Sequence, residues 1–138
     1  MPQYFARNTL VVENYDDAID FYANKLGVEL MEGTSLPAEG DKRWGVLRPP
    51  GSDVSSCALL LAKANNERQV THVGNQTDGR VGFFLFTDDV ERDHAKLLVD
   101  GVTIARPLTA FPYGRVLVFA DLYGNLWDLI ELSPMTVL

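Results

Sequence analysis

The sequence is poor in the features that mark exported or membrane proteins. It contains one cysteine, Cys57, so no internal disulfide can form, and a lone cysteine is typical of a reducing compartment. No apolar run approaches the 18 residues of a membrane-spanning helix, and the N-terminal "MPQYFARN" lacks the apolar stretch of a signal peptide. These absences predict a cytoplasmic protein.

Basic residues are also scarce. The chain has 12 lysines and arginines against 19 acidic residues, a formal net charge of −7, and no lysine- or arginine-rich run. Nucleic acid and anionic membrane surfaces bind basic patches, so this balance argues against either of them as the main partner. The chain has only two histidines, His72 and His94, and we interpret both as structural.

The remaining composition is that of an ordinary globular protein. The 138 residues are 46% hydrophobic and 22% charged. A chain of this length buries about 70% of the surface that its unfolded form exposes, which is enough for a core. The length predicts one domain or two small half-domains that share a core.

The first half of the chain predicts one strand, one helix and three further strands. "FARNTLVV" has the pattern of a strand, Asn14 stands at the position of a helix N-cap, and Gly27 is placed to end that helix in a left-handed conformation. The expected strands after the helix are "GVEL", "RWGVLRP" and "SCALLLAKA", while "EGTSLPAEGDK" is a loop or a weak edge segment. The apolar face of the helix comprises Tyr15, Ala18, Ile19, Tyr22 and Leu26.

The second half repeats this order after a linker at residues 65–79. The linker is expected to hold a short helix at about 66–72 that ends at Gly74, because a fully irregular loop of that length is unusual. "VGFFLF" then predicts a strand, and "DDVERDHAKLLVDG" predicts a helix with Asp88 as N-cap, Glu91 at the capping-box position and Gly101 as its end. The strands "VTIARP", "RVLVFAD" and "LWDLIEL" complete a second βαβββ pattern.

Two segments resemble the vicinal-oxygen-chelate superfamily, which contains glyoxalase I, the bleomycin-resistance proteins and the extradiol dioxygenases. They are "LVVENYDDAIDFYANKLGVEL" and the hairpin "VFADLYGNLWDLIEL", with its D-x-x-G-N turn. "RWGVLRPPGS", "GNQTDGRV" and "DLYGNLWDL" further resemble a bacterial branch of this superfamily whose chemistry is largely unassigned. The resemblance implies an α+β fold in one domain, residues 1–138, with half-modules at about 4–64 and 80–134. The two βαβββ modules would pair into a curled, U-shaped mixed sheet, often completed by a homodimer partner.

The resemblance also supplies a test for a metal site. Metal-using members of the superfamily carry ligands at four strand positions, which fall here on Arg7, the leucines of residues 59–61, Gly82 and Asp128. A guanidinium stays protonated and cannot ligate a metal, and leucine and glycine offer no donor atom. One carboxylate does not make a site, so we predict no metal and no other cofactor; a bound divalent metal is the alternative.

Strand alternation suggests which side chains face the cavity instead. Phe84 and Phe86 would line it beside an open space at Gly82, and Asp128 would face it from the last strand. We predict that Arg7 takes the place of the metal as the counter-charge of Asp128, because a bidentate arginine–carboxylate pair offsets the penalty for burying either charge. The pair is either structural or in contact with a ligand.

Further residues are candidates for the rim or wall of the cavity. Trp44, Gln76 and Tyr113 are either wall residues or packing residues. Three arginines near strand ends are weaker candidates, namely Arg43, Arg80 and Arg115. Trp127 is expected in the core, and Cys57 is expected to be a buried, inert thiol.

Two functions of different classes fit these features. The first is a metal-independent protein that binds a small organic molecule, as the bleomycin-resistance proteins do. The alternative is a metal-dependent lyase, isomerase or dioxygenase with Asp128 as catalytic base or remaining ligand. A regulatory or interaction module is a third possibility, and fold membership does not choose among them.

Overall fold

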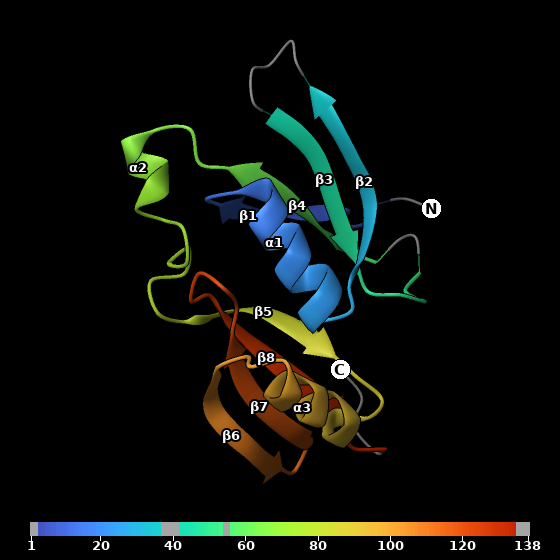
Figure 1. The fold of residues 1–138 in the computed structure, drawn as a ribbon. Coiled ribbons are helices and arrows are strands. Elements are labelled where there is room, and N and C mark those ends of the chain that lie inside the picture. The colour runs from blue at the N-terminus through green and yellow to red at the C-terminus, as the bar shows by residue number, and fades with distance from the viewer. Residues whose placement is uncertain (1–2, 37–41, 54–55, 135–138) are drawn as a thin grey trace. The chain divides into compact units, whose positions relative to one another are not determined.

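The computed structural model describes residues 3–36, 42–53 and 56–134, with the backbone alone for residues 32–36 and 42–44. The chain forms two compact units, Met1–Val73 and Gly74–Leu138. Each unit contains one four-stranded mixed sheet and few helices, so the fold is α+β (Figure 1).

The first unit holds an open sheet in the order β1-β4-β3-β2. Strands β1 and β4 run parallel, and the other neighbours run antiparallel. All four strands coincide with predicted segments, and β2 continues into the stretch that we expected to be a loop or weak edge. The elements are β1 (Arg7–Val12), α1 (Tyr15–Asp20), η1 (Phe21–Lys25), β2 (Glu29–Leu36), β3 (Lys42–Arg48), β4 (Ala58–Lys63) and α2 (Glu67–Val70).

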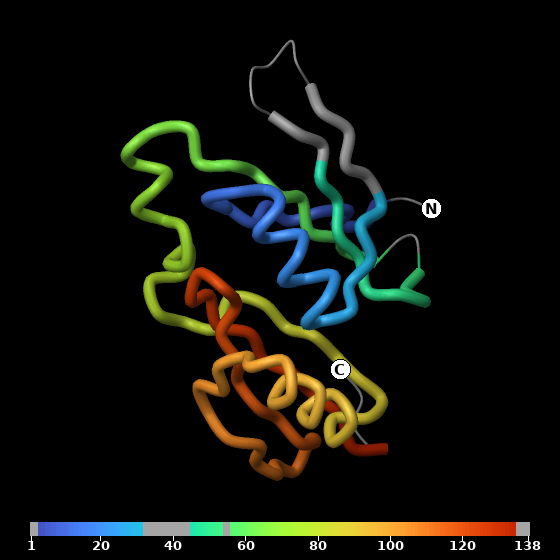
Figure 2. Tube along the Cα trace, in the orientation of Figure 1, coloured from blue at the N-terminus to red at the C-terminus, as the bar shows by residue number. Residues whose placement is uncertain are grey.

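The first helix begins as predicted and ends in a wider turn. The Asn14 side chain accepts a hydrogen bond from the Asp17 N–H, and Gly27 has a φ of +74°. Between them, η1 is a π-helical turn, visible in Figure 2 as the continuation of α1. The extra residue of a π turn shifts the apolar stripe, so Phe21 is buried while Ile19 and Leu26 are only half-buried. The sequence did not predict this turn.

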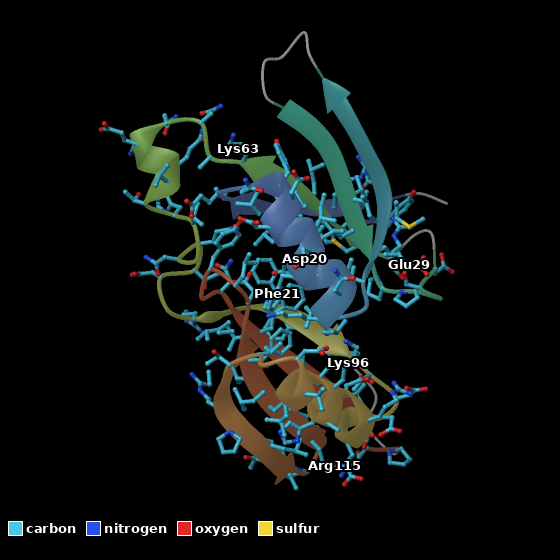
Figure 3. All side chains as sticks on the ribbon, viewed as in Figure 1. Asp20, Phe21, Glu29, Lys63, Lys96 and Arg115 are labelled. Carbon is cyan, nitrogen blue, oxygen red and sulfur yellow. The ribbon has the colours of Figure 1, made fainter. Side chains whose placement is uncertain are left out.

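Packing beneath α1 follows the alternation expected for β1. Leu10 and Val12 are fully buried, whereas Thr9 is exposed. The hydroxyl of Tyr15 accepts a hydrogen bond from the backbone N–H of Lys63, which ties the start of α1 to the end of β4, the residue labelled in Figure 3. This contact joins the helix to the strand that pairs with β1.

The second unit repeats the topology with an open sheet in the order β5-β8-β7-β6. Strands β5 and β8 are parallel, and β6–β7 and β7–β8 are antiparallel. The predicted internal repeat is therefore confirmed in element order and strand pairing, although each sheet is open rather than curled as we expected. The elements are β5 (Val81–Phe86), α3 (Val90–Val99), β6 (Ile104–Phe111), β7 (Gly114–Ala120) and β8 (Leu126–Leu132).

The N-cap of α3 differs by one residue from the prediction. Asp89, not Asp88, caps the helix, because its carboxylate accepts a hydrogen bond of 3.0 Å from the Arg92 N–H. Asp88 is exposed and pairs with the Arg92 guanidinium instead. Glu91 likewise lies outside a capping box and pairs with Arg115, while Gly101 ends the helix with a φ of +73° as predicted.

Three aromatic rings in register form the core beneath α3. Phe83, Trp127 and Phe119 are partners across β5, β8 and β7, and the Trp127 ring stacks on both neighbours at centroid distances of 4.7 and 5.9 Å. Trp127 is buried, so its predicted role in core packing is confirmed. The face of the sheet that carries these rings is covered by α3, and we call the opposite face the open face (Figure 1).

The turn between β7 and β8 is held by one buried carboxylate. Asp121 accepts hydrogen bonds from the backbone N–H groups of Tyr123 and Asn125 and from the Asn125 amide, each at 2.9 Å. These bonds explain the D-x-x-G-N pattern as an Asx-type turn. Gly74 packs directly against this turn, since a Cβ there would lie 1.9 Å from the Tyr123 carbonyl oxygen.

Candidate functional site on the open face of the second sheet

Strand register defines the residues of the open face. In its central row, Phe84 of β5 pairs with Asp128 of β8, Asp128 pairs with Val118 of β7, and Val118 pairs with Arg106 of β6. Partners across strands share a face, so these four side chains lie on the same side of the sheet. The next row contains Phe86, Ile130, Val116 and Thr109.

Asp128 is the acid that interrupts the apolar pattern of β8. The two residues beside it in the chain, Trp127 and Leu129, are buried on the helix face, whereas Asp128 is half-buried on the open face. Burial raises the pKa of Asp128, and the positive charge of Arg106 opposes that shift. Among the described residues, no group donates a hydrogen bond to this carboxylate.

Arg106 is the cation that acts on Asp128 within this unit, and sequence analysis missed it. It lies on the edge strand β6, where the register shifts on either side of it, between Ile104 and Arg106 and between Arg106 and Thr109. Such bulges interrupt the alternation of side chains between the two faces of a sheet. The alternating pattern of "VTIARP" therefore could not predict on which face of the sheet Arg106 lies. Arg106 is exposed, and within the described ranges its guanidinium makes no ion pair.

Exposed aromatic rings flank the charged row. Phe84 and Phe86 lie on the edge strand β5 and expose 60% and 52% of their surfaces. At the far end of the sheet, Phe111 and Tyr113 stack at a centroid distance of 5.5 Å, and both are exposed. A hollow of about 550 Å³ adjoins the end of β5, and its lining comprises Phe86, Thr87, Asp88, Glu131, Leu132 and Pro134.

The space expected at Gly82 is filled. A Cβ on Gly82 would lie 2.6 Å from the Thr77 methyl carbon, so the threonine occupies the volume that the absent side chain leaves. The expectation of an open space beside Phe84 was therefore wrong. Thr77 belongs to the turn that precedes β5, and the hydrogen bond from the Arg80 N–H to the Thr77 carbonyl closes that turn.

Arg115 is a structural residue rather than a rim residue. Its guanidinium binds the Glu131 carboxylate at 2.8 Å and the Glu91 carboxylate at 2.8 Å, on the face covered by α3 (Figure 3). Glu131 also accepts a hydrogen bond from the Val90 N–H at the start of α3. Arg115 therefore stabilises the docking of α3, and its candidacy as a rim residue was wrong.

The other predicted site residues belong to other segments of the chain. Cys57 is exposed, so the expectation of a buried thiol was wrong. Arg7 is an exposed residue at the start of β1 in the first unit, and its pairing with Asp128 in the second unit stays a prediction. Trp44 belongs to β3, but its side chain and that of Arg43 lie outside the described residues. Gln76 is half-buried and Arg80 is exposed in the segment before β5.

The donor set does not fit a superfamily metal. Leu60 pairs with Thr9 and Leu61 with Leu10, so the second ligand position is apolar in either register, and Gly82 abuts Thr77. Within residues 3–36, 42–53 and 56–134, no three His, Cys, Asp or Glu side chains gather closely enough to hold a metal ion. Asp128 alone of the four positions carries a donor group that a divalent ion would accept.

No helix in the described part of the chain is both long and apolar enough to cross a membrane.

The repeated βαβββ topology, one four-stranded mixed sheet in each unit, is that of the vicinal-oxygen-chelate type of protein. The family model of the Glyoxalase/Bleomycin resistance protein/Dioxygenase superfamily matches residues 4–129, and the chain belongs to this superfamily. An uncharacterized protein of Shewanella frigidimarina is 50% identical over 133 residues, which cover 96% of each chain.

Solved structures agree with this assignment. The crystal structure of UcmS2 has a TM-score of 0.78 and 25% identity, with coverage of 94% of this chain and 98% of that chain. TnmS3, an antibiotic binding protein from Streptomyces sp. CB03234, has a TM-score of 0.73 and 26% identity, with coverage of 95% and 97%. The predicted family and fold class are confirmed.

Proposed function

We propose that this protein binds a small, largely apolar organic molecule on the open face of the second sheet, without a metal ion. The exposure of Phe84 and Phe86 beside Asp128 carries the proposal. Large exposed apolar side chains gathered around a few polar groups are typical of small-molecule sites. The similarity to the antibiotic binding protein TnmS3 supports the same class of ligand.

The metal-free part of the proposal is supported by the chemistry of the four ligand positions. Arg7 stays protonated, Leu60 is apolar and Gly82 has no side chain, so a divalent ion would have Asp128 as its sole protein ligand. Metal analysis of the purified protein tests this directly. A bound divalent ion in one-to-one ratio after dialysis would overturn it.

A ligand-observed NMR screen of small aromatic compounds tests the binding site. The variants Phe84→Ala and Phe86→Ala are expected to weaken the binding of each hit about ten-fold, because each removes a ring that the ligand would cover. Leu98→Ala is the matched control, since Leu98 on α3 exposes 58% of its surface and lies on the helix instead of the open face. Hits whose affinity is unchanged in both phenylalanine variants would contradict the site.

Catalysis by Asp128 is the second candidate function. The raised pKa of Asp128 favours it, because a half-buried carboxylate without a described hydrogen bond is a stronger base than an exposed one. Asp128→Asn would then abolish the turnover of a substrate, although the substrate would still bind to the variant. Binding of hits without turnover in the native protein would leave the first function in place.

The homodimer and the cytoplasmic location stay predictions. Strands β1 and β2 in the first sheet, and β5 and β6 in the second, are edges on which a second copy could pair. Light scattering on the purified protein tests the dimer.

A further inference from the structure

The central row of the open face holds two opposite charges that do not meet. Arg106 and Asp128 are each in register with Val118, one strand away on either side. Two strand spacings separate their backbones by about 10 Å. Val118 between them is buried and offers no polar atom to either charge.

The other arginines of this sheet and its helix behave differently. Arg115 binds Glu131 at 2.8 Å, and Arg92 binds Asp88 at 3.0 Å. Neither Arg106 nor Asp128 makes an ion pair or side-chain hydrogen bond with any residue that the structure describes. Arg106 acts on Asp128 through its charge, which opposes the rise that burial causes in the pKa of the carboxyl.

The chemistry of such a pair restricts the group that can lie between its members. A ligand anion would be attracted by Arg106 and repelled by Asp128, and a ligand cation would meet the reverse. An uncharged group with one acceptor and one donor can bind both at once, with the acceptor on the guanidinium and the donor on the carboxylate. A primary amide and a hydroxy-ketone are groups of this kind.

The next residue of the row also indicates which kind of ligand would carry this donor–acceptor group. Phe84 is the neighbour of Asp128 on the side away from Val118, and it exposes 60% of its surface. An aromatic ring that stacks on Phe84 would bring its polar edge over Asp128 and toward Arg106.

We propose that Arg106 and Asp128 form a two-point anchor that selects aromatic ligands with an uncharged donor–acceptor edge. This inference rests on the proposed function of the open face, and it adds the class of ligand and the residues that discriminate it. Arg106 would contact the ligand from β6, a position outside every candidate that the sequence suggested.

Three naphthalene probes of one size test the anchor: 2-naphthamide, 2-naphthoate and 2-(aminomethyl)naphthalene. Their affinities are measured by NMR titration of the native protein, Arg106→Met and Asp128→Leu at pH 7. The native protein is expected to prefer the amide. Each variant should weaken the amide at least five-fold, since each removes a hydrogen bond to a charged group.

The charged probes should respond in opposite directions. Arg106→Met should weaken the naphthoate and strengthen the ammonium probe, and Asp128→Leu should do the reverse. Arg92→Met is the matched control, because Arg92 lies on α3 and is exposed, and it should leave all three affinities unchanged. Circular dichroism verifies that each variant is folded.

Two kinds of failure are distinguishable. If the probes bind and shift the signals of Phe84, but both variants retain the native order of affinities, the anchor is wrong while the proposed site stands. If Phe84→Ala leaves the binding of every probe unchanged, the proposed site itself is wrong.

Discussion

Arg106 and Asp128 stand on opposite sides of Val118 in one row of the second sheet, without an ion pair between them. The helix face of the same sheet shows the contrasting arrangement, since Arg115 and Glu131 are adjacent partners and bind each other at 2.8 Å. The first pair makes no ion pair with any described residue, as the proposed binding site requires, and the second pair holds α3 in place.

Replacing Asp121 should strongly destabilise the second unit. Asp121→Ala removes the acceptor of three hydrogen bonds in a buried turn, and we expect a loss of about 2–4 kcal/mol in the free energy of unfolding. Asp88→Ala is the control, because the Asp88 side chain is 88% exposed and should cost under about 0.5 kcal/mol. Urea titrations of both variants measure the difference, and equal losses would contradict the role of Asp121.

Two glycines with similar backbones should differ in their tolerance of alanine. Gly74 and Gly79 have φ values of +75° and +88°, so alanine at either costs about 1–2 kcal/mol through the left-handed conformation. Gly74→Ala should cost at least about 1–3 kcal/mol more, because its Cβ would overlap the Tyr123 carbonyl, whereas nothing lies within 4 Å at Gly79. Thermal unfolding compares the two, and a loss for Gly79→Ala as large as that for Gly74→Ala would exclude the close approach as the cause.

The docking of α3 should depend on acid pH. The Arg115 guanidinium, together with the Val90 N–H, lowers the pKa of Glu131. The unfolded chain therefore binds the proton more readily than the folded one, so Glu131 stabilises the fold above its ordinary pKa of about 4.3. That contribution is lost as the pH falls through the lowered pKa of the folded state.

Glu131→Gln is the variant that measures this effect. Its melting temperature should be below that of the native protein at pH 7, and the gap should narrow as the pH falls below about 4.3. Thermal melts across this range give the result. A gap that is independent of pH would assign the stabilisation to packing instead of charge.

Asp128 should have the opposite effect on stability. Burial raises the pKa of Asp128, so the folded chain holds the proton more readily than the unfolded one, and the charged form destabilises the fold at neutral pH. Asp128→Asn should therefore raise the melting temperature at pH 7. The gain should shrink as the pH falls through the raised pKa of the folded state, and it should be absent below the ordinary aspartate pKa of about 3.9. A lower melting temperature for Asp128→Asn at pH 7 would show that other groups of the folded protein stabilise the charged Asp128 carboxylate.

Local sequence determined most of the elements. Asn14 caps the first helix as expected, and Gly27 and Gly101 follow the first helix and α3 in left-handed conformations. The alternation in "LWDLIEL" put Trp127 and Asp128 on opposite faces of β8. Caps, left-handed ends and strand alternation depend on neighbouring residues, so a linear pattern records them. The resemblance of two segments to the vicinal-oxygen-chelate superfamily also predicted the family, which the family model confirms.

Tertiary structure decided the surroundings of the site. Which charged residue faces Asp128 from two strands away depends on the strand register. The bulges around Arg106 shift that register, and no residue pattern in "VTIARP" predicts them. Thr77 occupies the space beside Gly82, and this contact depends on how the turn before β5 packs against that strand. A sequence determines which residues alternate along one strand, but the contacts between strands follow from packing and register. These decided which cation of the second unit acts on Asp128.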